Sequence, residues 1–134
     1  GRRDPTLADL PPPRGRIAIF IPAWHETEVI APMLRTALAQ LRPGDARIYV
    51  AVYPNDAATL AAVRSVPDDR IRVVRNPLPG PTTKACNLNA CWRAMVADEA
   101  AEGAAFDAVV LHDAEDVVHP GELAVYSAWL ARFD

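Results

Sequence analysis

The chain has 134 residues, of which 51% are hydrophobic and 23% charged, and its formal net charge is −3 at pH 7. This length and composition predict about one globular domain, and the acidic balance gives no sign of a nucleic-acid-binding surface. No apolar run approaches the ~18 residues of a membrane span, and no signal-peptide pattern opens the chain.

Residues 1–15 are rich in proline and arginine and show no hydrophobic periodicity. This pattern predicts a linker or arm with polyproline II tendency at Pro11–Pro13. From Arg16 onward the pattern becomes regular, so we place one folded subdomain at residues 16–134.

Four apolar runs of strand length follow in that subdomain: Ile17–Ile21, Ile48–Tyr53, Ile71–Val74 and Phe106–Leu111. Runs without polar alternation are typical of strands that are buried on both faces of a parallel sheet. Between and after these runs, apolar residues recur at helical spacing, which predicts helices at about 30–41, 56–66, 84–97 and 121–133. The alternation of strand and helix predicts an α/β fold with right-handed crossovers and a mostly parallel, doubly wound sheet flanked by helices.

The predicted helix at 121–133 carries a large apolar surface close to Asp134. Such a surface needs a further element to cover it, so we expect this chain to be the front half of a larger protein.

Several common chemistries have no motif in this sequence. There is no GxGxxG fingerprint, Lys84 stands outside any P-loop pattern, and neither Ser65 nor Ser127 lies in a nucleophile elbow. Cys86 and Cys91 are too few for a disulfide framework and fit a reducing compartment. They stand roughly 140° apart around a helix, so they do not converge on a metal, and we expect buried, inert thiols.

Ligands of open α/β sheets bind beyond the carboxyl ends of the strands, where polar residues follow all four predicted strands. After the fourth strand come three carboxylates, Asp113, Glu115 and Asp116. Carboxylates this close repel one another unless a cation joins them, and Mg²⁺ or Mn²⁺ suits such ligands. The alternative is a solvated acidic turn.

The other three loops offer groups for a nucleotide. Thr82 or Thr83 can cap a helix that begins at Lys84, and this helix N-terminus with its lysine suits a phosphate; the alternative is an ordinary capped helix with an exposed lysine. Asp56 is equally suited to a helix N-cap and to a base ligand. Glu26 can accept a hydrogen bond from a ribose or base, or merely favour the first helical turn. Jointly the four loops predict a nucleoside-diphosphate site.

Four segments taken together resemble the N-terminal half of the family-2 glycosyltransferases of GT-A fold: IAIFIPAWHE, YPND, PGPTTKACNLN and LHDAEDVVHP. The resemblance covers about residues 16–130 and is strongest to the cellulose-synthase-like, membrane-anchored branch, in particular to the phage-adsorption type of the bacterial inner membrane. It implies a Rossmann-like, nucleotide-binding half of the GT-A fold that stops before the acceptor half.

Carried over residue by residue, the resemblance implies a nucleotide-binding set of Pro22, Ala23, Trp24, Glu26, Asp56, Lys84 and Asp113. It places Glu26 near the nucleoside, Asp56 at the uracil edge, and Lys84 near the diphosphate with Asn87 and Asn89 in the same stretch. Asp113-Ala114-Glu115 occupies the place of the DxD motif, so Mg²⁺ or Mn²⁺ would be held by Asp113, Glu115 and Asp116.

The sequence departs from the family pattern at two places. Glu115 stands where a second Asp is usual, which leaves open whether Glu115 or Asp116 is the main metal ligand. His25 replaces the usual Asn. A zinc site at His112 and His119 is a further alternative, set against ordinary polar roles.

The implied activity is inverting transfer of a sugar from a nucleotide sugar, a UDP-sugar by resemblance, in cell-envelope or exopolysaccharide synthesis. The catalytic base is expected beyond Asp134, as is the half that holds a polysaccharide or lipid-linked acceptor, so we expect this fragment to bind donor without transferring sugar. The implied location is the cytoplasmic side of a bacterial inner-membrane protein, with membrane contact only through other parts of the parent. The alternative is a non-catalytic nucleotide-binding or receptor module.

Overall fold

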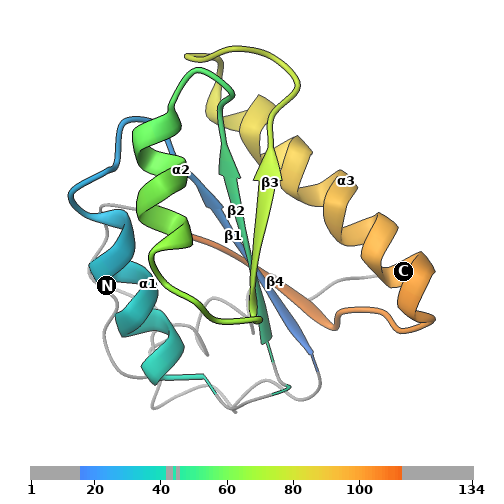
Figure 1. Cartoon of the computed structure of the whole chain (residues 1–134). Helices are drawn as coiled ribbons and strands as arrows, with labels where there is room; N and C mark the ends of the chain where they lie inside the picture. Colours follow the sequence, from blue (N-terminus) through green and yellow to red (C-terminus); the bar gives the residue numbers. More distant parts are fainter. Residues whose placement is uncertain (1–15, 42–43, 45, 113–134) are drawn as a thin grey trace, which may run out of the picture.

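The computed structural model describes residues 16–41, 44 and 46–112. In these residues four parallel strands form one sheet of order β3-β2-β1-β4 (Figure 1). The strands are β1 (Ile17–Pro22), β2 (Ala46–Val52), β3 (Ile71–Arg75) and β4 (Ala108–Leu111). The helices are α1 (Ile30–Ala39), α2 (Ala57–Arg64) and α3 (Lys84–Glu102). The predicted parallel α/β sheet flanked by helices is therefore confirmed.

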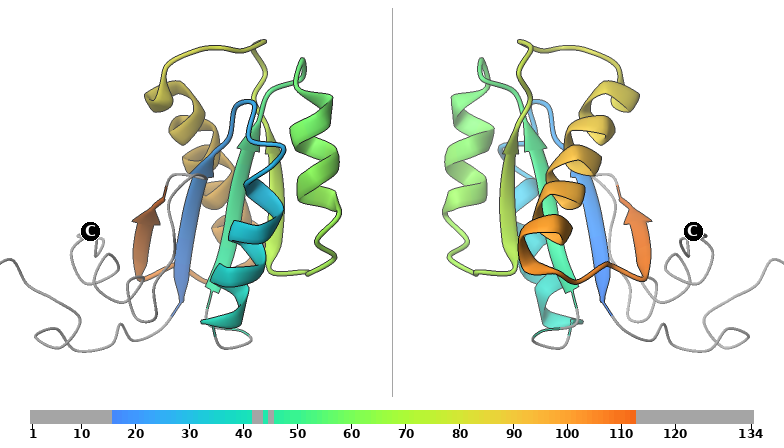
Figure 2. Two further views of the ribbon diagram at one scale, coloured as in Figure 1. Left: turned by 90° about the vertical axis from the view of Figure 1, so that its left-hand side faces the viewer. Right: turned by 90° about the vertical axis from the view of Figure 1, so that its right-hand side faces the viewer.

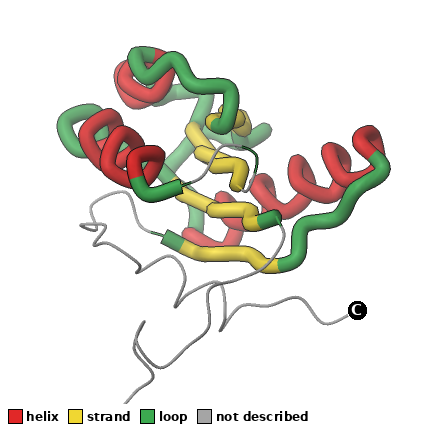
Figure 3. Tube along the Cα trace, turned by 90° about the horizontal axis from the view of Figure 1, so that it is seen from below, coloured by secondary structure: helices red, strands yellow, loops and turns green. Residues whose placement is uncertain are grey.

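The two faces of the sheet carry different helices because successive residues of a strand point to opposite sides. Ile19 of β1 and Val50 of β2 belong to the core cluster with α1 and α2, whereas Phe20 and Tyr49 belong to the cluster with α3. Figures 2 and 3 show α1 and α2 on one side of the sheet and α3 on the other. Both faces are covered, which explains why the strands are apolar without alternation.

The helix boundaries follow from capping residues. Asp56 caps α2 by accepting a hydrogen bond from the backbone N–H of Thr59, and Thr83 caps α3 by accepting one from Cys86 N–H at 3.1 Å. α3 runs about a turn further than the sequence predicts, because nothing breaks the helix before Gly103 (φ 68°).

An ion-pair network ties the amino-terminal end of the sheet to α3. Arg47 donates to both carboxylate oxygens of Glu102 (2.6 and 2.8 Å), and the hydrogen bond from Arg47 lowers the pKa of Glu102 to about 2. Tyr49 and Arg72 each donate to Asp98 at 2.8 Å. These contacts fix the direction in which α3 crosses the sheet, and with it the position of the helix start at the opposite end.

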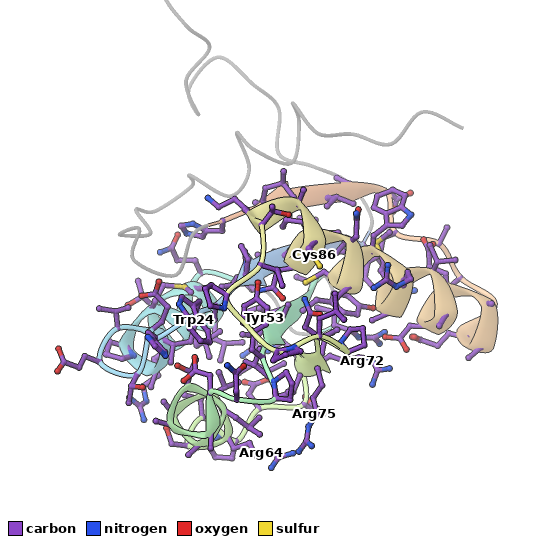
Figure 4. All side chains as sticks on the ribbon, turned by 90° about the horizontal axis from the view of Figure 1, so that it is seen from above. Trp24, Tyr53, Arg64, Arg72, Arg75 and Cys86 are labelled. Atoms are coloured by element: carbon purple, nitrogen blue, oxygen red, sulfur yellow. The ribbon has the colours of Figure 1, made fainter. Side chains whose placement is uncertain are left out.

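The outer edge of β3 in the described sheet carries positive charge. Arg72 and Arg75 are exposed on this strand, and Arg64 of α2 lies on the same side of the molecule (Figure 4). Exposed charges of this kind discourage pairing with a strand of another chain.

Among the described helices, none is both long and apolar enough to cross a membrane. The predicted arm at residues 1–15 and the predicted helix at 121–133 lie outside the described residues.

Candidate functional site

A pocket of ≈ 230 Å³ lies at the carboxyl ends of β1 and β2 and is closed on one side by the connection from β3 to α3. It is lined by Pro22, Ala23, Trp24, Glu26, Tyr53, Pro81, Thr82, Lys84 and Asn87. The pocket therefore draws on the loops that the sequence places after the first and third strands, together with Tyr53 at the end of β2.

The predicted nucleotide-binding residues fall into three groups. Those that line the pocket are Pro22, Ala23, Trp24, Glu26 and Lys84. Asp56 is described but lies outside the pocket lining, and Asp113 falls beyond the last described residue.

Asp56 holds the loop after β1 in place. Its side chain is 5% exposed, and its carboxylate accepts hydrogen bonds from the backbone N–H groups of His25 (2.8 Å) and Thr59 (3.4 Å). Burial by itself would raise the pKa of Asp56, but these hydrogen bonds outweigh burial and lower the pKa. The contact with Thr59 is that of an N-cap, one of the two roles that the sequence leaves open. The shorter contact with His25 ties the loop after β1 to the start of α2, a role that the sequence does not predict.

His25 adopts the left-handed conformation, with φ of 53°. Asn and His are both enriched among the non-glycine residues that occupy this region. His25, at the position where the resemblance implies an Asn, therefore suits the backbone of this turn. The N–H of His25 points at Asp56.

Two aromatic side chains form one wall of the pocket. Trp24 stacks on His25 with ring centroids 3.8 Å apart, and Tyr53 meets Trp24 edge-to-face at 5.2 Å. Figure 4 shows Trp24 and Tyr53 next to each other at the carboxyl end of the sheet. Because Tyr53 is only 4% exposed, the apolar surface that this wall offers to a flat ring such as a nucleobase comes from the half-buried Trp24.

Four lining residues stand outside the predicted nucleotide-binding set: Tyr53, Pro81, Thr82 and Asn87. Tyr53 is the last residue of an apolar run, so the sequence pattern assigns it to the strand core. The sequence feature that could have pointed to Tyr53 is its position at the carboxyl end of the predicted strand. A buried tyrosine there needs a hydrogen-bond partner for its hydroxyl. That partner is Thr82, with the two hydroxyl oxygens 2.6 Å apart.

Asn87 joins the start of α3 to the sheet. It is 2% exposed, donates to the carbonyl of Ala51 at 3.2 Å and accepts from the side chain of Asn76 at 3.2 Å. Because β2 ends at Val52, this contact fixes the first turn of α3 beside the strand end. Lys84, the first residue of α3, is thereby held at the pocket.

The start of α3 is the part of the pocket that suits an anion. The first N–H groups of a helix lack partners within the helix and carry the positive end of its dipole. Lys84 adds a full positive charge at the same place, and Glu26 is the one carboxylate among the described lining residues. The arrangement fits a phosphate beside Lys84, with the carboxylate of Glu26 as a hydrogen-bond acceptor in the same lining.

The two cysteines differ in their surroundings. Cys91 is buried, and burial raises the pKa of its thiol to about 12, in agreement with the expected inert thiol. Cys86 is only half-buried. Hydrogen bonds from Thr82 and then Asn76 lower the pKa of the Cys86 thiol. The expectation of burial is therefore wrong for Cys86. With its lowered pKa, we expect this thiol to be reactive rather than inert.

We expect iodoacetamide to alkylate Cys86 much faster than Cys91 in the native protein. The lowered pKa gives Cys86 more thiolate at neutral pH, and the reaction should reach half its maximal rate below the ordinary thiol pKa of about 8.5. Peptide mass spectrometry after timed quenching measures both rates, with Cys86→Ser as the control for labelling of Cys91. Equal rates for the two thiols in the native state would contradict this reading.

The predicted metal ligands, Asp113, Glu115 and Asp116, lie outside the described residues, as does His119. His112, the last residue described, donates its backbone N–H to Phe20 at 3.0 Å and so ends beside the carboxyl end of β1. Within the described part of the chain, no group of three His, Cys, Asp or Glu side chains could hold a metal ion. The metal site thus stays a prediction.

Sequence comparison gives a family and two curated relatives. The profile of the family described as "Glycosyltransferase like family 2" matches residues 12–134. Bacteriophage adsorption protein B of Escherichia coli strain K12 is 38% identical over 120 residues, which is 88% of this chain and 16% of that protein. Bacteriophage N4 adsorption protein B of Escherichia coli O157:H7 matches with the same identity and coverage. The chain thus spans about one sixth of the length of these relatives.

Structural comparison gives two transferases. The mannosyltransferase PcManGT from Pyrobaculum calidifontis, solved with GDP-Man and Mn²⁺, has a TM-score of 0.64 at 22% identity. The match covers 88% of this chain and 33% of the mannosyltransferase chain. Glucosyl-3-phosphoglycerate synthase from Mycobacterium tuberculosis, solved with Mg²⁺ and UDP, has a TM-score of 0.50 at 20% identity. The match covers 89% of this chain and 41% of the synthase chain. At these identities the likeness is one of fold, and it is to part of the GT-A glycosyltransferase fold. With the profile match over nearly all of its length, the chain belongs to the glycosyltransferase-like family 2.

Proposed function

We propose that this chain is the donor-binding part of an inverting glycosyltransferase and that its pocket takes the nucleoside diphosphate of a UDP-sugar. The observation that carries the proposal is the pocket itself. Lys84, the first residue of α3, lines the pocket together with Trp24 and Glu26. These are residue types that suit a diphosphate and a nucleoside, respectively.

Each part of the donor has a proposed set of residues. The diphosphate lies against Lys84, Thr82 and the first N–H groups of α3, where the positive charge of the lysine stabilises the departing phosphates. The nucleoside lies between the Trp24–Tyr53 wall and Glu26, whose carboxylate accepts a hydrogen bond from it. Asp56 serves the same site by fixing the backbone at His25.

We further propose that Mg²⁺ or Mn²⁺ accompanies the donor, with Asp113, Glu115 and Asp116 as its ligands. Hard divalent cations bind carboxylate and phosphate oxygens, and those residues follow β4 directly in the sequence. Bound there, the ion supplies Lewis-acid charge to the diphosphate.

The acceptor half and the carboxylate base belong, in this proposal, to the remainder of a longer parent protein of the bacterial inner membrane. The chain covers 16% of its curated relatives and 33% of the mannosyltransferase chain, so much of those proteins has no counterpart here. A base is needed to deprotonate the acceptor hydroxyl. The parent's proposed product is a cell-envelope or exopolysaccharide glycan.

A second candidate function is a nucleotide-binding or receptor module without transferase chemistry. The observation in its favour is the 38% identity to a protein named for bacteriophage adsorption. Both candidates share the pocket, and they differ in whether the parent protein transfers sugar.

Calorimetric titration of the chain with UDP and with GDP, in the presence and absence of Mn²⁺, tests the proposal. We expect saturable UDP binding that Mn²⁺ strengthens, with the Mn²⁺ effect lost in Glu115→Ala and kept in Ser65→Ala, a change at the far end of α2. Absence of saturable binding of either nucleotide, with or without the metal, would refute the donor site. Equal UDP affinity with and without Mn²⁺ would refute the proposed metal site.

A further inference from the structure

One side chain from another loop contacts the backbone of the connection from β3 to α3 twice. Asn55, which follows β2, accepts a hydrogen bond from the backbone N–H of Gly80 and donates one to the carbonyl of Gly80, both at 2.8 Å. The two residues are 25 positions apart in the sequence. A carboxamide is the side chain whose planar end offers one acceptor and one donor side by side, as this double contact needs.

Gly80 is held where only a glycine fits. A Cβ atom built on Gly80 would lie 2.7 Å from Cγ of Tyr53 and 2.8 Å from Cζ3 of Trp24. The backbone of the connection therefore rests directly on the aromatic wall of the pocket. Asn55 stands outside the pocket lining and holds Gly80 in this position.

The residues that follow Gly80 in the chain are those proposed to meet the donor's diphosphate. Pro81, Thr82 and Lys84 all line the pocket. Thr82 is joined to the hydroxyl of Tyr53, so the connection has a second point of attachment to the β2 end of the sheet. Asn76 steadies its beginning by accepting from Leu78 N–H at 3.0 Å.

We propose that Asn55 is a positioning residue for donor binding: it clamps Gly80 onto Trp24 and Tyr53 and thereby keeps the phosphate end of the pocket formed before the nucleotide arrives. The inference rests on the proposed function. Without the clamp the connection leaves its binding position for part of the time, and the apparent affinity falls by the fraction of molecules that remain competent.

Asn55→Ala and Asn55→Asp test the clamp. Alanine removes both hydrogen bonds. Aspartate keeps an acceptor for the Gly80 N–H but places a carboxylate beside the Gly80 carbonyl. Ser65→Ala is the matched control, because it removes a side-chain-to-backbone hydrogen bond of 2.6 Å at an exposed helix end away from the pocket.

Two measurements are needed on each variant of the full chain: amide hydrogen exchange and calorimetric titration with UDP. In Asn55→Ala we expect faster exchange confined to the amides of Leu78, Gly80, Thr82 and Thr83, the residues of 77–83 that carry a backbone N–H. We also expect a loss of UDP affinity of about tenfold, which corresponds to a pocket formed about a tenth of the time. Asn55→Asp should give a smaller change in both, and Ser65→Ala a change in neither. The exchange of α1 and α2 should stay as in the wild type.

The outcomes separate the clamp from the donor site. Faster exchange with unchanged UDP affinity, or weaker affinity with unchanged exchange, overturns the positioning role. Unchanged exchange in Asn55→Ala overturns the clamp even if the wild type binds no nucleotide. Failure of the wild type to bind UDP or GDP refutes the proposed function and, with it, the role in donor binding, whatever the exchange shows.

Discussion

Replacement of Lys84 by alanine should weaken UDP binding by about thirtyfold, the equivalent of ~2 kcal/mol for one charge-assisted hydrogen bond. Lys84 is the only lysine in the sequence, and it brings its charge to the N-terminus of α3 at the pocket. Uridine, which lacks phosphates, should bind wild type and variant alike. Calorimetric titration of both ligands measures the two affinities at fixed ionic strength.

Arg93→Ala is the matched control for Lys84→Ala, because it removes one exposed positive charge from the same helix and alters the net charge equally. Lys84→Arg should keep part of the affinity, since the charge remains while the shape of the donor changes. Raising the salt concentration should weaken UDP binding to the wild type more than to Lys84→Ala. If Arg93→Ala costs as much as Lys84→Ala, the effect is one of overall charge and Lys84 has no particular role at the diphosphate.

The sheet could be predicted because its sequence signal is strong. Ile17–Ile21 is uninterrupted by polar residues, and the structure covers both faces of that strand, one with α1 and α2 and one with α3. The helix starts could also be predicted, since Asp56 and Thr83 are residue types that cap helices. Placing the strand ends at one edge then brings Trp24 and Lys84 into a single pocket by topology alone.

The contacts between the loops could not be predicted. Asn55 meets Gly80 across 25 positions, and Tyr53 meets Thr82 across 29. Sequence periodicity reports which face of an element is buried and carries no information on which loop residue meets which. Tyr53 shows the limit most clearly, because an apolar pattern assigns its ring to the core and says nothing of its hydroxyl.

The predicted metal ligands, Asp113, Glu115 and Asp116, lie outside the described residues, so the metal site after β4 remains a prediction.

Asp56 marks a different limit, because the same carboxylate suits two roles and composition cannot choose between them. Its oxygens accept from the N–H of His25, in the loop after β1, and from the N–H of Thr59, in the first turn of α2. A residue that joins the β1 end to the α2 start should matter for folding whether or not nucleotide is present.

We expect Asp56→Ala to lower the free energy of unfolding by about 1–3 kcal/mol at pH 7, because it removes a helix cap and leaves the part-buried N–H of His25 without its acceptor. Urea unfolding followed by circular dichroism measures this change. Asp69→Asn, at an exposed carboxylate in the connection from α2 to β3, is the control and should lie within about 0.5 kcal/mol of the wild type.

Asp56→Asn adds a test by pH. The native pKa of Asp56 lies below the ordinary value of 3.8, so its ionised form stabilises the fold above that pH, and this contribution is lost as the pH falls through the lower native pKa. Asparagine does not titrate, so the gap in stability between wild type and Asp56→Asn should be widest near neutral pH and should shrink below pH 3.8. A gap of the same size at pH 7 and pH 3 would mean that the charge of Asp56 contributes nothing, and that the loop after β1 is held by shape alone.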